Sequence, residues 1–473
     1  MERRKFLKLS GCGLLTMPAM SQATEASGVE PPNILLIITD QQFGDLMSCA
    51  MGNEYLHTPN MDSLAENGMR FTRAYSPNPL CVPMRTSMIT GHYPHQTGVL
   101  TNSPEFNPGK FPLMGSIFKK AGYETAYFGK WHIPISVKNK EIHGFDAFVE
   151  KDAQLDPEPA AAFIRKKHDR SYLAVASFLS PHEICEWARK EKLPGGSIGE
   201  PPPFDERPPM KTNSEPPQNE TDIIAYMRKA FQSWESGGRL MFPVANYTED
   251  DWRRHTWGYY RLIERADAFV GRLLQALRES GREENTVVIF LSDHGDCHGA
   301  HRWNQKTVFY DESSRVPFII SQKGATPKGT SDFLVNVGVD IFPTLCDFAG
   351  IDVPDCLPGL SMKAAALGRN QLQERDYVVS QNHMVQCAAI NGLRLTPHGR
   401  MVRSERYKYC LYSEGERRES LVDMEQDHGE MVNQAGNPDF RTILNQHRAF
   451  LKEFAEKHKD GKALEMLRYG TDM

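Results

Sequence analysis

Acidic side chains follow two of the most apolar runs in the sequence, at 33–39 and 286–291. The first run leads into Asp40 and Gln41, and the second into Asp293, His294 and Asp296. An aspartate after a strand often caps a helix, so either segment alone is weak evidence for a site. In open α/β sheets, however, functional groups gather at the carboxyl ends of the strands. Because hard divalent cations prefer oxygen ligands, the two segments together predict a metal site.

The segment 80–91, LCVPMRTSMITG, places a cysteine beside an unusual set of residues. A plain account makes Cys81 a small buried residue and Pro83 a first-turn helix residue. That account leaves Arg85 and the Thr90-Gly91 pair unexplained. The segment resembles the signature of the sulfatase family, Cys-x-Pro-x-Arg followed by Thr-Gly. The resemblance implies that a formylglycine-generating enzyme, as a maturation partner, oxidises Cys81 to formylglycine.

Other segments resemble sulfatase motifs and occur in the family's order. They are GKWH at 129–132, SPH at 180–182, SDHGD at 292–296 with the trailing Lys306, and the C-terminal segments 403–409 and 421–427. Taken singly, a lysine here would be a solvated surface residue and a histidine a structural one. The resemblance covers nearly the whole mature chain. Because the order of the motifs and their chemistry both agree with the family, we interpret these residues together as one catalytic site.

Sulfate ester hydrolysis requires charge neutralisation, because the nucleophile approaches a sulfur atom shielded by negative oxygens and the alcohol is a poor leaving group. The resemblance implies one divalent metal ion held by Asp40, Gln41, Cys81, Asp293 and His294. Lys130 and Lys306 would add positive charge at the sulfate. Arg85, with its planar fork of donors, would hold the modified residue in place.

A hydrated formylglycine carries two hydroxyl groups on one carbon. One attacks sulfur, and the second allows collapse to the aldehyde with loss of inorganic sulfate, which a serine or cysteine cannot do. By the resemblance, His132 is the base that assists this collapse. His182, together with Lys306, would protonate the leaving alcohol.

Two departures from the family pattern leave the metal and the substrate open. Asp40-Gln41 replaces the paired aspartates of many sulfatases, and Asp293-His294 replaces an Asp-Asn pair. These pairings resemble branches that include choline sulfatases and phosphonate or phosphodiester hydrolases, and Asp-His also occurs in glycosaminoglycan sulfatases. Fewer carboxylates weaken calcium relative to metals that accept nitrogen ligands. Calcium remains our prediction for an exported enzyme, with manganese and magnesium as alternatives.

Three functions are therefore weighed. The first is a sulfatase acting on a sulfated small molecule or glycan fragment. The second is a phosphonate monoester or phosphodiester hydrolase, since the same nucleophile and cations serve phosphorus. The third is a carbohydrate-binding relative without catalytic activity, which a complete set of motifs argues against. Specificity would come from the loops at 185–192, 193–220 and 252–260.

These residues require elements that bring them to one edge of a sheet. Short apolar runs alternate with amphipathic segments, which predicts an α/β fold with a mostly parallel sheet sandwiched by helices, as in alkaline-phosphatase-like proteins. The predicted strands are 33–39, 123–128, 172–179, 286–291 and 316–320, and the predicted helices include 58–67 and 251–280. The proline-rich stretch 193–220 predicts an irregular excursion, either a roof over the site or a structural loop.

The pattern of predicted elements changes after Arg375, from alternating strands and helices to several strands followed by one helix. Strands at 377–380, 403–412 and 420–423 and a closing helix at 440–457 predict a smaller C-terminal α+β subdomain. With 473 residues, the chain exceeds what one core usually supports. We therefore expect a catalytic domain at 29–375 and a C-terminal subdomain at 376–473.

Residues 1–28 resemble an export signal of the twin-arginine type, with Arg3-Arg4 before a short apolar region. That region is too short to cross a bilayer, so we expect no stable membrane span and a periplasmic or extracellular protein. A lipid anchor at Cys12 is a less favoured alternative. Cys346 and Cys356 are one candidate disulfide pair among nine cysteines. The net charge of -5 gives no electrostatic case for nucleic acid.

Overall fold

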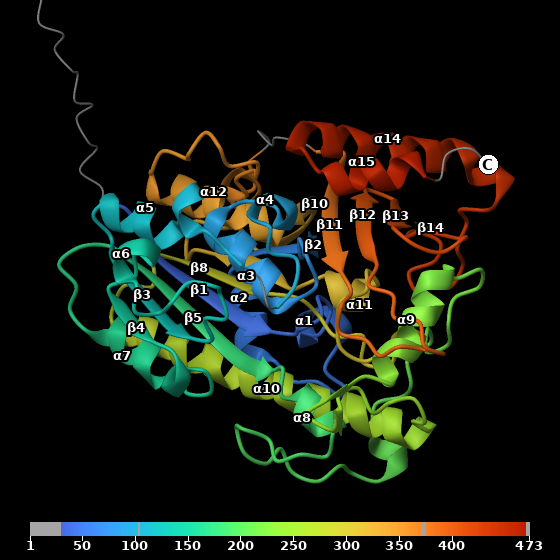
Figure 1. Ribbon diagram of the computed structural model, residues 1–473. Helices are drawn as coiled ribbons and strands as arrows, with labels where there is room; N and C mark the ends of the chain where they lie inside the picture. Colours follow the sequence, from blue (N-terminus) through green and yellow to red (C-terminus); the bar gives the residue numbers. More distant parts are fainter. Residues whose placement is uncertain (1–29, 103–104, 370–374, 470–473) are drawn as a thin grey trace, which may run out of the picture. The chain divides into compact units, whose positions relative to one another are not determined.

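The computed structural model describes residues 30–102, 105–369 and 375–469. Its main element is a sheet of eight strands: β1 (Asn33–Asp40), β2 (Gly68–Tyr75), β3 (Glu124–Gly129), β4 (Ala147–Val149), β5 (Tyr172–Pro181), β8 (Thr286–Ser292), β9 (Phe318–Ser321) and β10 (Gly329–Asn336). They lie in the order β10-β2-β9-β8-β1-β5-β3-β4 (Figure 1). Of these eight strands, only β9 runs antiparallel to its neighbours. The predicted α/β class with a mostly parallel sheet is confirmed.

Helices cover both faces of this sheet. One face packs against α2 (Pro59–Glu66), α7 (Glu158–Arg165) and the long α10 (Glu249–Glu279). The other packs against α3 (Cys81–Thr90), α5 (Met114–Lys120), α12 (Val337–Ala349) and α13 (Lys363–Ala366). β1 is buried along its whole length because alternate side chains enter the two cores. This explains why its sequence is continuously apolar rather than alternating.

Shorter elements connect these layers. They are α1 (Ser48–Met51), α4 (Pro94–Thr97), α6 (Lys140–His143), α8 (Ile184–Ala188), α9 (Asp222–Gln232), α11 (Asp311–Ser314), β6 (Glu235–Ser236) and β7 (Arg239–Leu240). The five strands predicted for the large sheet are present, whereas β2, β4 and β10 are additional. Several side chains of β2 are half-buried, and several of β10 are half-buried or exposed, so their sequences lack the continuous apolar run of a central strand.

The C-terminal part forms a second, antiparallel sheet of β11 (Tyr377–His383), β12 (His398–Ser404), β13 (Tyr407–Tyr412) and β14 (Glu419–Asp423). Two helices follow, α14 (Arg441–His458) and α15 (Gly461–Arg468), and α15 lies beyond the predicted closing helix. The single strand predicted at 403–412 is wrong. A turn after Ser404 divides it into β12 and β13, and the Ser404 hydroxyl accepts a bond from the Tyr407 amide, 3.2 Å away.

The stretch 193–220 is irregular, as predicted, apart from a short 3-10 helix at Phe204–Glu206. Its carbonyls at Asn213 and Ser214 accept bonds from the His301 and Arg302 amides at 2.7 and 2.8 Å. The Asn213 amide also donates to Glu312 at 2.9 Å. The excursion therefore supports the loop that leads to Lys306, whereas its action as a roof remains a prediction.

The predicted signal at 1–28, including Cys12, lies outside the described residues. Among residues 30–102, 105–369 and 375–469, no helix combines the length and the apolar character that a membrane crossing needs. The cysteines in these ranges are all free thiols. Cys346, which is buried, and Cys356, which is exposed, are both among these free thiols, so the candidate disulfide between them is not formed.

Candidate active site

The two acidic segments meet because β1 and β8 are parallel neighbours, with Thr39 paired to Ser292. The residues that follow, Asp40 and Asp293, therefore leave the same edge of the sheet together. The backbone amide of Gln41 donates to the Asp293 carboxylate at 3.1 Å, which joins the two strand ends directly. Both aspartates are fully buried.

The signature segment forms α3, and Cys81 is its first residue. Arg85 lies four residues later, so both side chains project from one face of the helix. Gly91 ends the helix in the left-handed conformation at φ 69°, and a side chain there would meet Leu357 at 2.7 Å. The proline of the signature thus lies in the first turn of one buried helix, and its glycine ends that helix.

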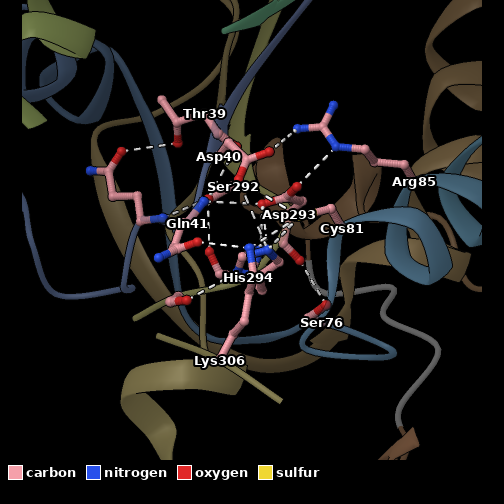
Figure 2. Close-up of polar contacts among 12 residues, drawn as sticks. Thr39, Asp40, Gln41, Ser76, Cys81, Arg85, Ser292, Asp293, His294 and Lys306 are labelled. Carbon is pink, nitrogen blue, oxygen red and sulfur yellow. Dashed lines mark hydrogen bonds and ion pairs between the residues drawn. The ribbon is translucent and has the colours of Figure 1, made fainter. Parts of the chain in front are cut away.

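Arg85 holds the two aspartates together. Its fully buried guanidinium donates to Asp293 at 2.9 Å and to Asp40 at 3.0 Å (Figure 2). It also donates to the Ser177 hydroxyl and the Lys130 carbonyl, at 2.7 and 2.9 Å. The sequence predicted a contact with the modified residue, whereas these bonds orient the carboxylates around it.

Four side chains converge as a candidate metal site. The ligand atoms of Asp40, Cys81, Asp293 and His294 all lie within 4.8 Å of one another, and all four residues are buried. His294 Nδ1 lies 3.0 Å from the Gly295 carbonyl, which leaves Nε2 to face Cys81 Sγ at 3.1 Å. The bond from Nδ1–H to the Gly295 carbonyl fixes the tautomer in which Nε2 is free to bind a metal. The Cys81 sulfur occupies the position of the formylglycine oxygen, so the set fits a divalent cation that accepts oxygen and nitrogen ligands.

Gln41 belongs to the same edge, but its side chain makes other contacts. Its amide oxygen accepts a bond from Lys306 Nζ at 2.7 Å, and its amide nitrogen donates to Asp296 at 2.6 Å. The oxygen that the sequence assigned to the metal is therefore hydrogen-bonded to a lysine here. Its part as a ligand remains a prediction.

Both predicted lysines reach the same centre. Lys130 Nζ lies 2.6 Å from the Asp40 carboxylate and 3.9 Å from Cys81 Sγ. Lys306 Nζ lies 3.2 Å from the same sulfur. Lys130 follows Gly129 at the end of β3, where φ is 96° and a side chain would meet the Ser177 carbonyl at 1.9 Å. Only glycine allows the strand end to turn Lys130 inward.

The two histidines lie at the rim. His132 is exposed and His182, just beyond β5, is half-buried. Burial has the largest influence on the pKa of Cys81 and on that of His182, and His132 also acts on the pKa of Cys81, as Cys81 does on the pKa of His182. The structure thus brings both beside residue 81, and their division into base and acid remains a prediction.

Comparisons with known proteins agree with this geometry. The family model described as Sulfatase matches residues 32–351, and the model described as N-sulphoglucosamine sulphohydrolase, C-terminal, matches residues 299–457. The chain belongs to the sulfatase family. This sulfatase is 32% identical over 455 residues to a Delta 4,5-hexuronate-2-O-sulfatase of Bacteroides thetaiotaomicron, covering 92% of this chain and 91% of the relative.

Two further relatives extend the comparison. An ulvan-active sulfatase of Formosa agariphila is 30% identical over 465 residues, covering 90% of this chain and 81% of the relative. The solved structure of a 2-O GAG sulfatase superposes with a TM-score of 0.77 at 29% identity, covering 91% of this chain and 93% of that one. The fold is alkaline-phosphatase-like, and this sulfatase is a sulfuric ester hydrolase. Family membership implies a metal ion and formylglycine.

The electrostatics of the site favour an anion at residue 81. Burial alone would raise the pKa of the Cys81 thiol, but Lys130, Lys306 and His294 together hold it well below its usual value. For Asp40, burial and Cys81 favour the protonated form, whereas Lys130, His182 and Arg85 hold the pKa well below its usual range. Burial, then Lys306 and Lys130, lowers the pKa of His182 to about 4. The positive charge of the lysines therefore dominates the pocket.

Sequence reasoning missed the contacts that three residues make in this site. Ser177 supports Arg85, but it lies inside an apolar strand and has no distinguishing neighbour. Cys185 lies 3.5 Å from the Gln41 amide nitrogen, and burial raises its pKa to about 12, so it is an inert thiol. Asp296 stands in a recognised motif, yet only the structure shows which side chain it contacts.

Proposed function

We propose that this sulfatase removes sulfate from glycan fragments, using formylglycine made from Cys81 and a divalent metal bound at Asp40, Cys81, Asp293 and His294. One observation supports this proposal above all: His294 Nε2 and Lys306 Nζ both contact Cys81 Sγ, at 3.1 and 3.2 Å. The hexuronate sulfatase and the ulvan-active sulfatase, both at least 30% identical, support a sulfated glycan as substrate.

A bound divalent metal supplies positive charge that polarises the sulfate and the nucleophile. Residues of the chain neutralise charge, position groups and transfer protons. The ammonium groups of Lys130 and Lys306 donate to sulfate oxygens and neutralise charge that grows as the ester bond breaks. Arg85 keeps the two aspartates in register. His182 and Lys306 deliver a proton to the leaving alcohol oxygen, and His132 accepts one from the hydrated residue 81.

Mass spectrometry combined with turnover tests this proposal. Protein produced together with a formylglycine-generating enzyme should show the mass of an aldehyde in the peptide that contains residue 81. It should hydrolyse sulfated disaccharides that carry a uronic acid, and aryl sulfates faster than aryl phosphodiesters. Faster phosphodiester turnover would favour the phosphonate or phosphodiester hydrolase, and an unmodified Cys81 without turnover would favour the binding protein.

We further propose calcium as the metal, with manganese and magnesium as alternatives. Two carboxylates suit calcium, whereas the imidazole of His294 suits manganese better. Removal of metal with a chelator should abolish turnover, and calcium should restore it at the lowest concentration. Restoration by manganese alone would overturn the calcium assignment without affecting the sulfatase assignment.

We also propose export by the twin-arginine route, which residues 1–28 support by their sequence. Replacement of the arginine pair, Arg3→Lys with Arg4→Lys, should leave the protein in the cytoplasm of a producing bacterium. Continued export of the double variant would contradict this route.

A further inference from the structure

A chain of buried polar side chains connects Lys306 to a residue that no catalytic role covers. Asp296 accepts a bond from the Gln41 amide nitrogen at 2.6 Å, and the Gln41 oxygen accepts one from Lys306 Nζ at 2.7 Å. Lys306 then reaches residue 81 at 3.2 Å. Gln41 and Asp296 are fully buried, and Lys306 is 6% exposed.

The direction of every bond in this chain follows from chemistry. An ammonium group only donates and a carboxylate only accepts, so Gln41 must turn its oxygen to Lys306 and its nitrogen to Asp296. The second oxygen of Asp296 accepts the backbone amides of His298 and Gln305, at 2.7 and 3.0 Å. Asp296 thus acts as an acceptor at both oxygens, which an asparagine cannot do.

Lys306 needs such support because of where it lies. It belongs to an irregular loop in which Arg302, Gln305 and Thr307 all have positive φ, and its own stem is flexible. Precise placement of an ammonium group on a long side chain requires a fixed acceptor.

We propose that Asp296 is a positioning residue that orients the Gln41 amide so that Gln41 holds Lys306 against residue 81. This inference rests on the proposed role of Lys306 at the sulfate. It also explains a glutamine rather than an acidic residue at position 41, because a carboxylate there would face the Asp296 carboxylate.

Reversal of the donor and acceptor roles tests the proposal. In Asp296→Asn, the remaining oxygen keeps the backbone bonds, so the new NH2 group faces the Gln41 nitrogen. Gln41 must then flip its own NH2 group toward Lys306. In Gln41→Glu, two carboxylates face each other. Each single variant should lower kcat/KM for 4-nitrophenyl sulfate about 100-fold, the loss typical of one misplaced charge-stabilising donor.

The double variant Gln41→Glu with Asp296→Asn restores every bond, since the new amide at position 296 donates to the new carboxylate at position 41, which also accepts from Lys306. It should recover kcat/KM to within about tenfold of the parent enzyme. Asp267→Asn is the matched control, because Asp267 is also a buried carboxylate that accepts backbone amides, at Asn60 and Met61, away from this chain. It should leave kcat/KM unchanged.

Calorimetry with inorganic sulfate supplies a readout independent of turnover. Both single variants should bind sulfate more weakly, as should Lys306→Ala, and the double variant should bind it as the parent does. A folded double variant no better than either single variant overturns the proposal. Parent protein that binds sulfate without hydrolysing the ester would contradict the proposed function alone.

If Asp296→Asn does not fold, Gln41→Met decides, because it keeps the side-chain length but cannot hold Lys306. Calorimetry should measure metal affinity beside sulfate affinity, because Gln41 is also a predicted metal ligand. Weakened sulfate binding at unchanged metal affinity supports the proposal, whereas unchanged sulfate binding, or a loss that follows the metal affinity, overturns it.

Discussion

Two clusters of charge are buried in this sulfatase, one at the carboxyl edge of the large sheet and one where the C-terminal sheet meets α11. The edge cluster consists of Asp40, Cys81, Arg85, Lys130, Asp293 and Lys306. The C-terminal cluster consists of Asp311, Lys408 and Glu430, with Lys408 Nζ 2.5 Å from Asp311 and 2.7 Å from Glu430. Both are almost free of solvent contact, so burial alone does not distinguish them.

The difference lies in how charge is balanced. In the edge cluster, three cations face two carboxylates, and the remaining positive charge is directed at residue 81. In the C-terminal cluster, Lys408 lies between two carboxylates and also donates to the Phe309 carbonyl at 3.1 Å, and Arg315 pairs with Asp311 at 2.7 Å, so two cations balance two carboxylates. Excess charge of one sign at a reactive atom therefore marks the catalytic cluster, and mutual pairing marks the structural one.

Cys81→Ala should have the largest effect. It removes the precursor of the nucleophile and should lower kcat for an aryl sulfate by about 10⁴-fold or more. Thermal unfolding should change little, because the side chain is small. Cys49→Ala, at an exposed cysteine, is the control and should keep full activity. Residual turnover of Cys81→Ala near the parent rate would show that another residue attacks sulfur.

Lys408→Met should act on stability instead. Removal of the lysine leaves the buried Glu430 carboxylate without a cation, although Asp311 keeps its bond with Arg315 at 2.7 Å. An uncompensated buried charge should cost about 3–5 kcal/mol in the free energy of unfolding. Urea denaturation measures this loss. The folded fraction should keep its kcat/KM, and Lys452→Met, at an exposed pair with Glu456, should be nearly neutral. Loss of kcat/KM in the folded fraction would contradict a purely structural role for the C-terminal cluster.

Lys130→Met is the reciprocal variant in the edge cluster. It should lower kcat/KM about 10²- to 10³-fold, because one cation at the sulfate is lost. The variant also breaks the buried ion pair between Lys130 and Asp40 at 2.6 Å. Because Asp40 keeps its bond with Arg85 and repulsion among the three cations falls, the free energy of unfolding should change by about 1 kcal/mol or less. A stability loss as large as that of Lys408→Met would mean that the edge cluster also serves the fold.

The pH dependence of stability should reveal the C-terminal cluster. Burial raises the pKa of Glu430 to about 7; Lys408 opposes this, whereas Asp311 and Glu312 add to it. Because the folded pKa exceeds the unfolded one, the stabilisation is complete below about pH 4.5 and is lost as pH rises through 7. The loss should be about 1–3 kcal/mol by differential scanning calorimetry. Glu430→Gln should match the parent at pH 5 and exceed it at pH 8. An unchanged pH profile in Glu430→Gln would assign the dependence to another group.

Much of the fold followed from local pattern. β1, β5 and β8 are continuous apolar runs because helices cover both faces of the sheet, and such runs are visible in a sequence. β2 and β10 escaped notice because their side chains are partly exposed. The turn after Ser404 escaped because the flanking residues suit a strand, and only pairing between β12 and β13 requires it.

The sequence by itself determined the identities of the reactive groups, since a signature helix with Cys81 and Arg85 carries its chemistry in residue type and spacing. Only the tertiary structure decided their partners. Arg85 bonds with Asp40 and Asp293, and Gln41 bonds with Lys306 and Asp296, across separations of up to 265 residues. Bonds of this kind depend on which strand ends become neighbours, and that is a property of the assembled sheet rather than of any local segment.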